Sequence, residues 1–385
     1  MEITQKQKYE ILQHEIQKGV GLDQIVKLGL EILMKSEREE HNLQNGDYSN
    51  GYRYRKMFGS GKLLELKVPR TRDGGFHPII LTLLKDQEEE ARELAFCLYG
   101  SGLTTLEVSN IFGRLYGKNY SSSQVSRMFE YARKDIEEWK RRPLESYYPI
   151  IYIDATFIST RRGESCSKEA YYTMLGVKAD MTREVIAVIN NPTESASFWE
   201  DILEEQKKRG IREVGLFVSD GLIGIENALW KSFPNANVQL CTVHFQRECA
   251  KCVRAKDRTL FCSELSAVFQ SEEGDKPIDG LNKWKHFYEK WKHTYPFLKK
   301  KNNDRIALYF TYMNYDVRIR NMIYSTNWIE RLNKMYKRVT KMRGALPNTD
   351  AVLLLLCNVA MNVKAYDFPV TSFRFESEKF KWDIN

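Results

Sequence analysis

The chain has 385 residues, 42% of them hydrophobic and 12% aromatic, which excludes a disordered tail and predicts two or three domains. The longest apolar run, Ala351–Cys357, is far shorter than the roughly 20 residues of a membrane span. The polar start MEITQKQKYEILQHEIQ has no signal-peptide core, and seven cysteines, an odd number, argue against a disulfide scaffold. We therefore expect a cytoplasmic protein with no membrane partner. The formal net charge of +8 favours an anionic partner.

The positive charge is clustered in three stretches. Arg331–Arg343 has six basic residues and no acid, Tyr52–Arg72 has seven against Glu65, and Lys283–Lys301 has seven against Glu289. Any one basic stretch can be a solvated face that keeps the protein soluble. A membrane surface would instead select a long amphipathic helix with an aromatic face. Three clusters in different contexts favour nucleic acid.

The first region, residues 1–87, combines a helix with a hairpin. Apolar residues at near-helical spacing predict a helix over 1–44. Turn signals at Asn45-Gly46 and Asn50-Gly51 precede two alternating segments, Tyr52–Arg55 and Leu64–Val68, which predict two strands. The first of these strands should have one wet basic face, formed by Arg53 and Arg55, that binds DNA.

Residues 88–145 have the pattern of a helix-turn-helix. Thr104 and Glu107 form a capping box ahead of one amphipathic helix, which Gly117 should end, and Ser121–Ser123 offers the cap of a second. The exposed start of the second helix would present Ser123, Gln124, Ser126 and Arg127 to DNA. Many helical hairpins bind nothing, and that alternative stays open.

After a linker bracketed by Pro143 and Pro149, the pattern becomes α/β. The order is three strands, helix, strand, helix, strand, which is the order of a ribonuclease-H-like core. We expect the first part of this core at 146–254, a helical stretch at 255–320 and the final helices of the core at 321–385. The expected strands are 150–158, 170–179, 184–189, 214–219 and 238–243, and the expected helices 195–209 and 225–233.

Three acids stand out in this region. Asp154 lies within an apolar strand, where a carboxylate is costly unless it is paired or binds metal. Asp220 follows an apolar strand, at the end where α/β sheets usually place ligands, and Glu330 lies in a helix that Ser325-Thr326-Asn327 can cap. Separately they also fit a strand edge, a common turn and a surface glutamate. Together, in such a core, they would hold two Mg²⁺ ions, which Mn²⁺ can replace, for phosphoryl transfer.

The helix that carries Glu330 is strongly basic. On helical spacing Glu330, Asn333, Lys334, Lys337 and Lys341 share one broad face. Met335 and Val339 lie on another face, suited to packing on the sheet. We expect the three lysines to contact DNA phosphates, with a solvated basic face as the alternative.

Cys241 and His244 have two possible roles. With Cys249 and Cys252 they make a C-x₂-H-x₄-C-x₂-C pattern that can bind zinc. In the other interpretation Cys241 ends a strand, His244 lies near DNA or the acids, and Cys249 and Cys252 are buried on a helix.

At these residues the chain resembles the bacterial insertion-sequence transposases of the Mutator type, a branch of the DDE transposases. The resemblance covers nearly the whole chain, and Trp328 stands where that family usually has a small residue. The matching motifs are Asn50–Arg53, Leu64–Arg70, Leu98-Tyr99, Gly102–Thr105, Leu115–Gly117, Ser126-Arg127, Asp154-Ala155, Val218–Gly221, Cys241–His244, Thr326–Asn333, Val339–Lys341 and Arg343–Ala345.

The resemblance implies a transposase. Asp154, Asp220 and Glu330 would be the metal ligands, and Cys241 and His244 an auxiliary Cys-x-x-His element. The helical stretch 255–320 would be an insertion in the ribonuclease-H-like core. The partners would be terminal inverted repeats and target DNA, bound by a homo-oligomer in the bacterial nucleoid. Water and then a 3′-hydroxyl would attack, without a covalent protein–DNA intermediate. A non-catalytic DNA-binding regulator, which would not need the acids, and a simple nuclease are the alternatives.

Overall fold

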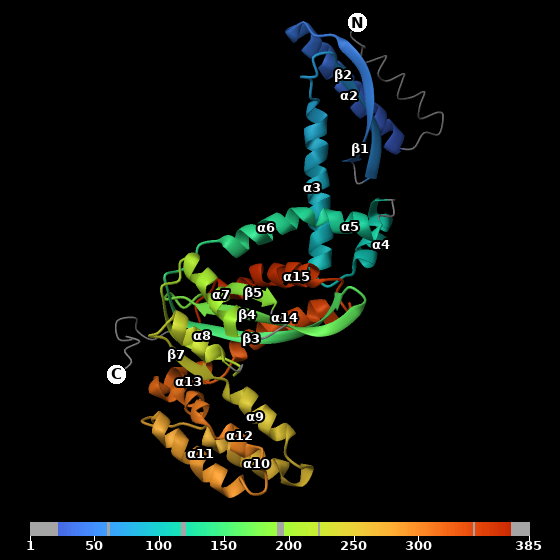
Figure 1. Cartoon of the computed structure of the whole chain (residues 1–385). Helices are drawn as coiled ribbons and strands as arrows, with labels where there is room; N and C mark the ends of the chain where they lie inside the picture. The colour runs from blue at the N-terminus through green and yellow to red at the C-terminus, as the bar shows by residue number, and fades with distance from the viewer. Residues whose placement is uncertain are drawn as a thin grey trace. The chain divides into compact units, whose positions relative to one another are not determined.

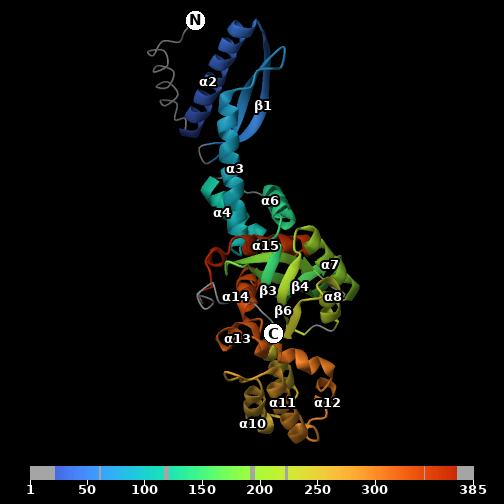
Figure 2. The same ribbon diagram turned by 90° about the vertical axis from the view of Figure 1, so that its left-hand side faces the viewer.

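The computed structural model describes residues 22–59, 62–116, 121–190, 196–221, 224–341 and 343–370. The chain divides into two compact units, Met1–Lys134 and Asp135–Asn385. Figures 1 and 2 label their elements, and each unit is described by itself. Within the described ranges, no helix is long and apolar enough to cross a membrane.

The first unit begins with a helix and a hairpin. Helix α2 (Leu22–Asn45) is followed by the antiparallel strands β1 (Ser49–Gly59) and β2 (Lys62–Thr71) and by α3 (Ile79–Gly100). The inner face of the hairpin packs against α2 and α3 in one apolar core, formed by Met34, Met57, Leu64, Leu66, Val68, Leu81 and Leu84. The predicted helix and hairpin are therefore confirmed for these residues, whereas residues 1–21 of the expected helix lie outside the described part.

The register of the hairpin changes one expectation. Arg53 pairs with Val68 and Arg55 with Leu66, so both arginines lie on the face that buries the apolar residues of β2. Tyr52 and Tyr54, 41% and 68% exposed, lie on the other face. The basic face of β1 is therefore the face that carries Met57, and it is wet only in part, because Arg53 is exposed and Arg55 is half-buried. The physical reason is the alternation of side chains along a strand. Met57 enters the core, so Arg55 and Arg53, two and four residues before it, lie on the same face as Met57.

Two short helices follow α3, each begun by a capping box. Ahead of α4 (Thr105–Tyr116), Glu107 N donates to Thr104 Oγ1 (3.2 Å) and Thr104 N to Glu107 Oε2 (2.7 Å). Ahead of α5 (Ser122–Met128), Gln124 N donates to Ser121 Oγ and Ser121 N to Gln124 Oε1. The first capping box confirms the prediction. Gly117, expected to end the first helix, lies outside the described residues, and α6 (Glu130–Arg141) comes next.

The second unit is built on a mixed five-stranded sheet of order β5-β4-β3-β6-β7. Strand β3 is antiparallel to β4, and β4 to β5, whereas β6 is parallel to β3 and β7 to β6. The strands and helices follow one another in the expected order, with three strands first and then helix, strand, helix and strand. The bounds are β3 (Tyr147–Arg162), β4 (Ser165–Val177), β5 (Arg183–Asn190), α7 (Ala196–Lys208), β6 (Glu213–Ser219), α8 (Ile225–Ser232) and β7 (Asn237–Leu240).

Helices cover both faces of this sheet, which explains the nearly continuous apolar run of β3. Trp199 of α7 and Leu229 of α8 pack with Ile151 and Ile153 on one face. On the other face, α14 (Asn327–Lys341) contacts β3, and α15 (Thr349–Met361) contacts β3 and β5. Figure 2 shows the sheet between these two layers. Alternate residues of β3 therefore point to opposite helical layers, and Asp154 belongs to the α14 side.

Between β7 and α14 the described chain is helical, as its lack of strand periodicity predicts. Buried aromatic rings, among them Phe245, Phe261 and Trp284, form its core. Arg320, 7% exposed, donates to four backbone carbonyls, those of Glu272, Asp275, Met313 and Tyr315. The elements are α9 (Thr242–Lys251), α10 (Ala255–Val268), α11 (Pro277–Trp291), α12 (Leu298–Lys301), the 3₁₀ helices η1 (Asp304–Tyr309) and η2 (Thr311–Asn314), and α13 (Val317–Ile323); η3 (Lys364–Tyr366) follows α15.

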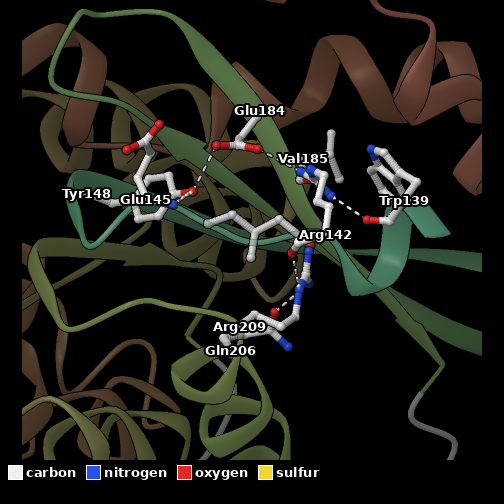
Figure 3. Close-up of polar contacts among 9 residues, drawn as sticks. Trp139, Arg142, Glu145, Tyr148, Glu184, Val185, Gln206 and Arg209 are labelled. Carbon is white, nitrogen blue, oxygen red and sulfur yellow. Dashed lines mark hydrogen bonds and ion pairs between the residues drawn. The ribbon is translucent and has the colours of Figure 1, made fainter. Parts of the chain in front are cut away.

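A polar network fixes the segment that leads into β3 (Figure 3). Arg142 forms an ion pair with Glu184 of β5 (2.7 Å), and Tyr148 Oη donates to the same carboxylate (2.8 Å). Arg209, just after α7, donates to the carbonyls of Arg142 (3.2 Å) and Ile186 (2.8 Å). The start of the central strand is thereby held against the edge strand and the end of α7.

Candidate active site

The three acids of interest come from three elements of the second unit. Asp154 is on β3 and only 4% exposed, and Asp220 directly follows β6. The parallel pair Ile153↔Ser219 brings the next residues of both strands, Asp154 and Asp220, side by side. Glu330 lies in the first turn of α14, which packs on β3. The fold therefore gathers the three carboxylates on one side of the sheet.

Asp154 is held in an environment that disfavours its charge. Burial raises the pKa of Asp154 to about 7, and the negative charges of Asp220 and Glu330 add to this effect, whereas His244 opposes it. Asn333 Nδ2, on α14, donates to Asp154 Oδ2 at 2.7 Å. A cation placed among these carboxylates would offset both the cost of burying the Asp154 charge and the repulsion between the three negative charges.

Cys241 joins the starts of two helices. It follows β7, and its Sγ accepts from the backbone N–H of His244 in α9 (3.5 Å) and of Thr326, just ahead of α14 (3.4 Å). Burial alone would raise the pKa of the Cys241 thiol, but its hydrogen bonds and the charge of His244 lower it. Cys241 thus fixes α9 relative to the helix that carries Glu330.

His244 lies close enough to two of the acids to interact with them electrostatically. Its interaction with Cys241 raises the pKa of His244 to about 9, against the effect of burial, and Asp154 and Asp220 contribute in the same direction. The imidazole is therefore protonated at neutral pH. One turn further along α9, Arg247 Nη1 donates to Glu330 Oε1 at 2.9 Å. Sequence reasoning missed Arg247, because a single exposed arginine on a polar helix gives no signal.

The turn after Asp220 is held from the helical segment. Gly221 has φ +86°, a left-handed conformation that suits glycine, and an added Cβ would approach Tyr309 Oη to 3.2 Å. Arg305 of η1 donates to the carbonyl of Gly221 (2.9 Å) and to the buried carboxylate of Glu226. Residues of the helical segment therefore set the position of the second acid.

The acids have the donor chemistry of a magnesium site, since carboxylate oxygens are hard ligands. As placed, however, Glu330 binds Arg247 and Asp154 binds Asn333. Within the described ranges, no group of three or more His, Cys, Asp and Glu side chains is arranged to hold a metal ion. The same holds for the zinc pattern, in which Cys249 is buried and Cys252 exposed.

The basic face of α14 differs from the expectation at Asn333. Lys334, Lys337 and Lys341 are exposed, and the ion pairs of the described residues include none of them. Asn333, expected on the same face, is buried against Asp154, and Met335, expected to pack on the sheet, is half-buried. The side chains that α14 buries are Ile329, Leu332, Asn333, Tyr336, Val339 and Thr340.

Trp328 is accommodated on the other side of α14 from Glu330. The guanidinium of Arg183 lies over its ring (5.0 Å) and over that of Tyr366 (4.9 Å). Met335 and Arg331 line the same small pocket. The large side chain at position 328 therefore packs away from the acids.

Replacing Asn333 by leucine should impair the metal-dependent reaction that the sequence predicts, while the fold persists. Asn333→Leu keeps the branched shape but removes the hydrogen bond to Asp154, the metal ligand that the sequence predicts, and loss of a group that orients a metal ligand typically lowers metal affinity or activity about 10- to 100-fold. In an assay of the Mg²⁺-dependent strand cleavage that the sequence predicts, this variant should require a higher Mg²⁺ concentration. The control is Asn358→Leu on α15, a half-buried amide away from the acids; equal losses in both variants would contradict the prediction.

Comparison with known proteins gives a consistent picture. The profile of the family described as "Transposase, Mutator family" matches residues 2–368. The chain is 33% identical to the transposase for insertion sequence element IS1201 of Lactobacillus helveticus, over 80% of this chain and 82% of that protein. It is 30% identical to the transposase for IS256 in transposon Tn4001 of Staphylococcus aureus, over 86% and 87%, and 29% identical to that for IS905 of Lactococcus lactis, over 89% and 83%.

Proposed function

The chain belongs to the Mutator family of transposases, and from that premise we propose a metal-dependent DNA transposase of the DDE type. It would bind the terminal inverted repeats of an insertion sequence, cleave the DNA strands there and join them to target DNA. The observation that carries the proposal is the meeting of Asp154, Asp220 and Glu330 on one side of the sheet, close enough for their charges to interact. A transposase acts on DNA, and three convergent carboxylates suit phosphoryl transfer.

The proposed core is ribonuclease-H-like. It is supported by three antiparallel strands followed by two parallel ones, with one acid on β3, one after β6 and one on a later helix. The three carboxylates would hold Mg²⁺ or Mn²⁺. When bound, these ions activate the attacking water or 3′-hydroxyl and stabilise the leaving oxygen. Asn333 orients Asp154, and Arg305 holds the turn after Asp220.

Recognition of the element ends is assigned to the first unit. On α5 the side chains of Gln124, Ser126 and Arg127 are exposed, although Gln124 Oε1 also caps its helix. Partial burial lowers the pKa of Arg53 on the hairpin, as do the nearby guanidinium groups of Arg55 and Arg70. Such a cluster of like charges favours an anionic ligand. Because two ends must be processed together, we propose that the active form is a homo-oligomer on DNA.

The test is an assay with purified full-length protein, Mg²⁺, DNA carrying the element end and a supplied target plasmid. We expect nicked ends that become joined to the plasmid. A non-catalytic regulator would bind the end without cutting it, and a simple nuclease would cut without joining. Either result would contradict the proposal.

The exposed lysines of α14 should bind DNA phosphates beside the acids. For the double variant Lys337→Ala, Lys341→Ala we expect weaker binding to cleaved-end DNA regardless of sequence. For every phosphate that the variant no longer binds, the slope of log affinity against log salt should be smaller by about 1. The matched control is Lys207→Ala, Lys208→Ala at the end of α7, which covers the opposite face of the sheet. A salt slope equal to that of the unaltered chain would assign these lysines to a solvated face.

A further inference from the structure

Helix α9 supplies a positive charge to each part of the acidic site. His244 and Arg247 are three residues apart, so they lie on the same face of the helix. His244 interacts with Asp154 and Asp220, and Arg247 donates to Glu330 at 2.9 Å. The three carboxylates that the proposed function assigns as metal ligands thus interact with basic side chains of the chain itself.

The contact between Arg247 and Glu330 is one that can be exchanged. The two side chains are 56% and 28% exposed, and ion pairs with this much solvent contribute only about 0.2–1 kcal/mol. A guanidinium binds a phosphate as well as it binds a carboxylate, with the same forked geometry. Arg247 therefore has two suitable anions if a phosphate comes within reach.

The arrangement of α9 restricts the exchange to the side chain of Arg247. Cys241 Sγ accepts from the backbone at His244 and from Thr326 N and Oγ1, which ties the start of α9 to the segment ahead of α14. The distance between the two helix starts is therefore fixed by buried groups. Glu330 can leave Arg247 by rotation of these two solvent-accessible side chains, without movement of either helix.

We propose that Arg247 binds Glu330 in the DNA-free protein and exchanges it for a phosphate oxygen of the bound DNA strand when metal ions take Glu330. The inference rests on the proposed function, because it assumes that Glu330 binds metal. It adds Arg247 to the residues that bind the substrate, and it gives a reason why metal binding at Glu330 accompanies the arrival of DNA. Arg247 competes with metal before DNA arrives and binds the strand afterwards.

The experiment uses the full-length chain with Mn²⁺ as the probe. Free Mn²⁺ is titrated by electron paramagnetic resonance without DNA, and affinity for cleaved-end DNA is measured in Mn²⁺ over a salt series. We expect Arg247→Gln to bind Mn²⁺ roughly three- to fivefold more tightly, because a competing cation is gone. Its DNA affinity should fall, with a salt slope smaller by about 1. A merely structural residue would not strengthen one ligand and weaken the other.

Two further variants make the result specific. Arg247→Lys keeps the charge and should retain the salt slope. Arg318→Gln removes an arginine of matched exposure, 54%, that pairs with Asp316 at 2.8 Å in the same unit, and should change neither Mn²⁺ nor DNA binding. Unchanged or weaker Mn²⁺ binding by Arg247→Gln, or an unchanged salt slope, would overturn the proposal.

A second route does not depend on the folding of Arg247→Gln. Glu330→Gln removes the negative charge that holds Arg247 in the absence of metal, so in EDTA its DNA affinity should rise and its salt slope should increase by about 1. Absence of this increase also overturns the proposal. These binding measurements are independent of cleavage. If the unaltered chain binds Mn²⁺ and DNA as described but cuts no ends, the proposed function fails and the exchange at Arg247 stands.

Discussion

Asp154→Asn, Asp220→Asn and Glu330→Gln are each expected to abolish strand cleavage and to retain binding of element ends, which for Glu330→Gln should become stronger in the absence of metal. Each change removes one negative charge of the proposed metal site and keeps the shape of the side chain. Metal ions supply several kcal/mol of transition-state stabilisation, so cleavage should fall by about a thousandfold or more. Binding of element ends should persist, because we propose that the first unit carries this recognition and the three acids lie in the second unit. Cleavage of labelled end DNA in Mg²⁺ and a mobility-shift assay measure the two effects.

The matched control for these acids is Asp201→Asn on α7, an exposed acid of the same unit. It should cleave normally. A variant of the trio that keeps near-normal cleavage would remove that residue from the catalytic set, and a variant that loses both cleavage and end binding would indicate damage to the fold.

In the absence of metal, stability should fall as the pH rises through the range in which Asp154 ionises. Burial, together with Asp220 and Glu330, raises the pKa of Asp154 from its usual 3.8 to about 7. Between these values the folded chain binds more protons than the unfolded chain, so the free energy of unfolding decreases with rising pH. At about 1.4 kcal/mol per pH unit, the loss between about pH 4.5 and 6.5 is on the order of 3 kcal/mol.

Urea unfolding in EDTA at several pH values measures this slope. Asp154→Asn has no carboxyl to ionise, so its stability should be nearly flat in the same range, whereas Asp201→Asn should follow the unaltered chain. The window ends near 6.5 because His244, whose pKa rises from 6.5 to about 9 on folding, lowers stability with rising pH only above that value. Parallel slopes for Asp154→Asn and the unaltered chain would contradict the raised pKa.

Local pattern was enough to predict much of the fold. The strand expected at 214–219 is β6 (Glu213–Ser219), and the capping box at Thr104 and Glu107 begins α4. Both signals depend on neighbours in sequence. The pairing of strands in the sheet follows from the order of elements, and the acids were found through their setting in strands and through the family motifs.

Contacts between distant segments could not be predicted in this way. Arg247 meets Glu330 across 83 residues, and Arg305 meets Gly221 across 84. Asn333 stands between a buried leucine and an exposed lysine, so spacing alone leaves its side of α14 undecided until the helix packs on β3. In β1 the alternation is evident in the sequence, but which set of residues faces the core depends on the partner strand.

The order of the two units along the chain has a consequence for protein synthesis. The first unit ends at Lys134, whereas the last of the three acids lies on α14. Roughly 200 more residues must be translated before that helix is complete, which takes about 10–40 s at typical rates, while the N-terminal unit can already fold. A nascent chain that recognises element ends, as proposed, therefore has time to bind DNA before it is able to cut.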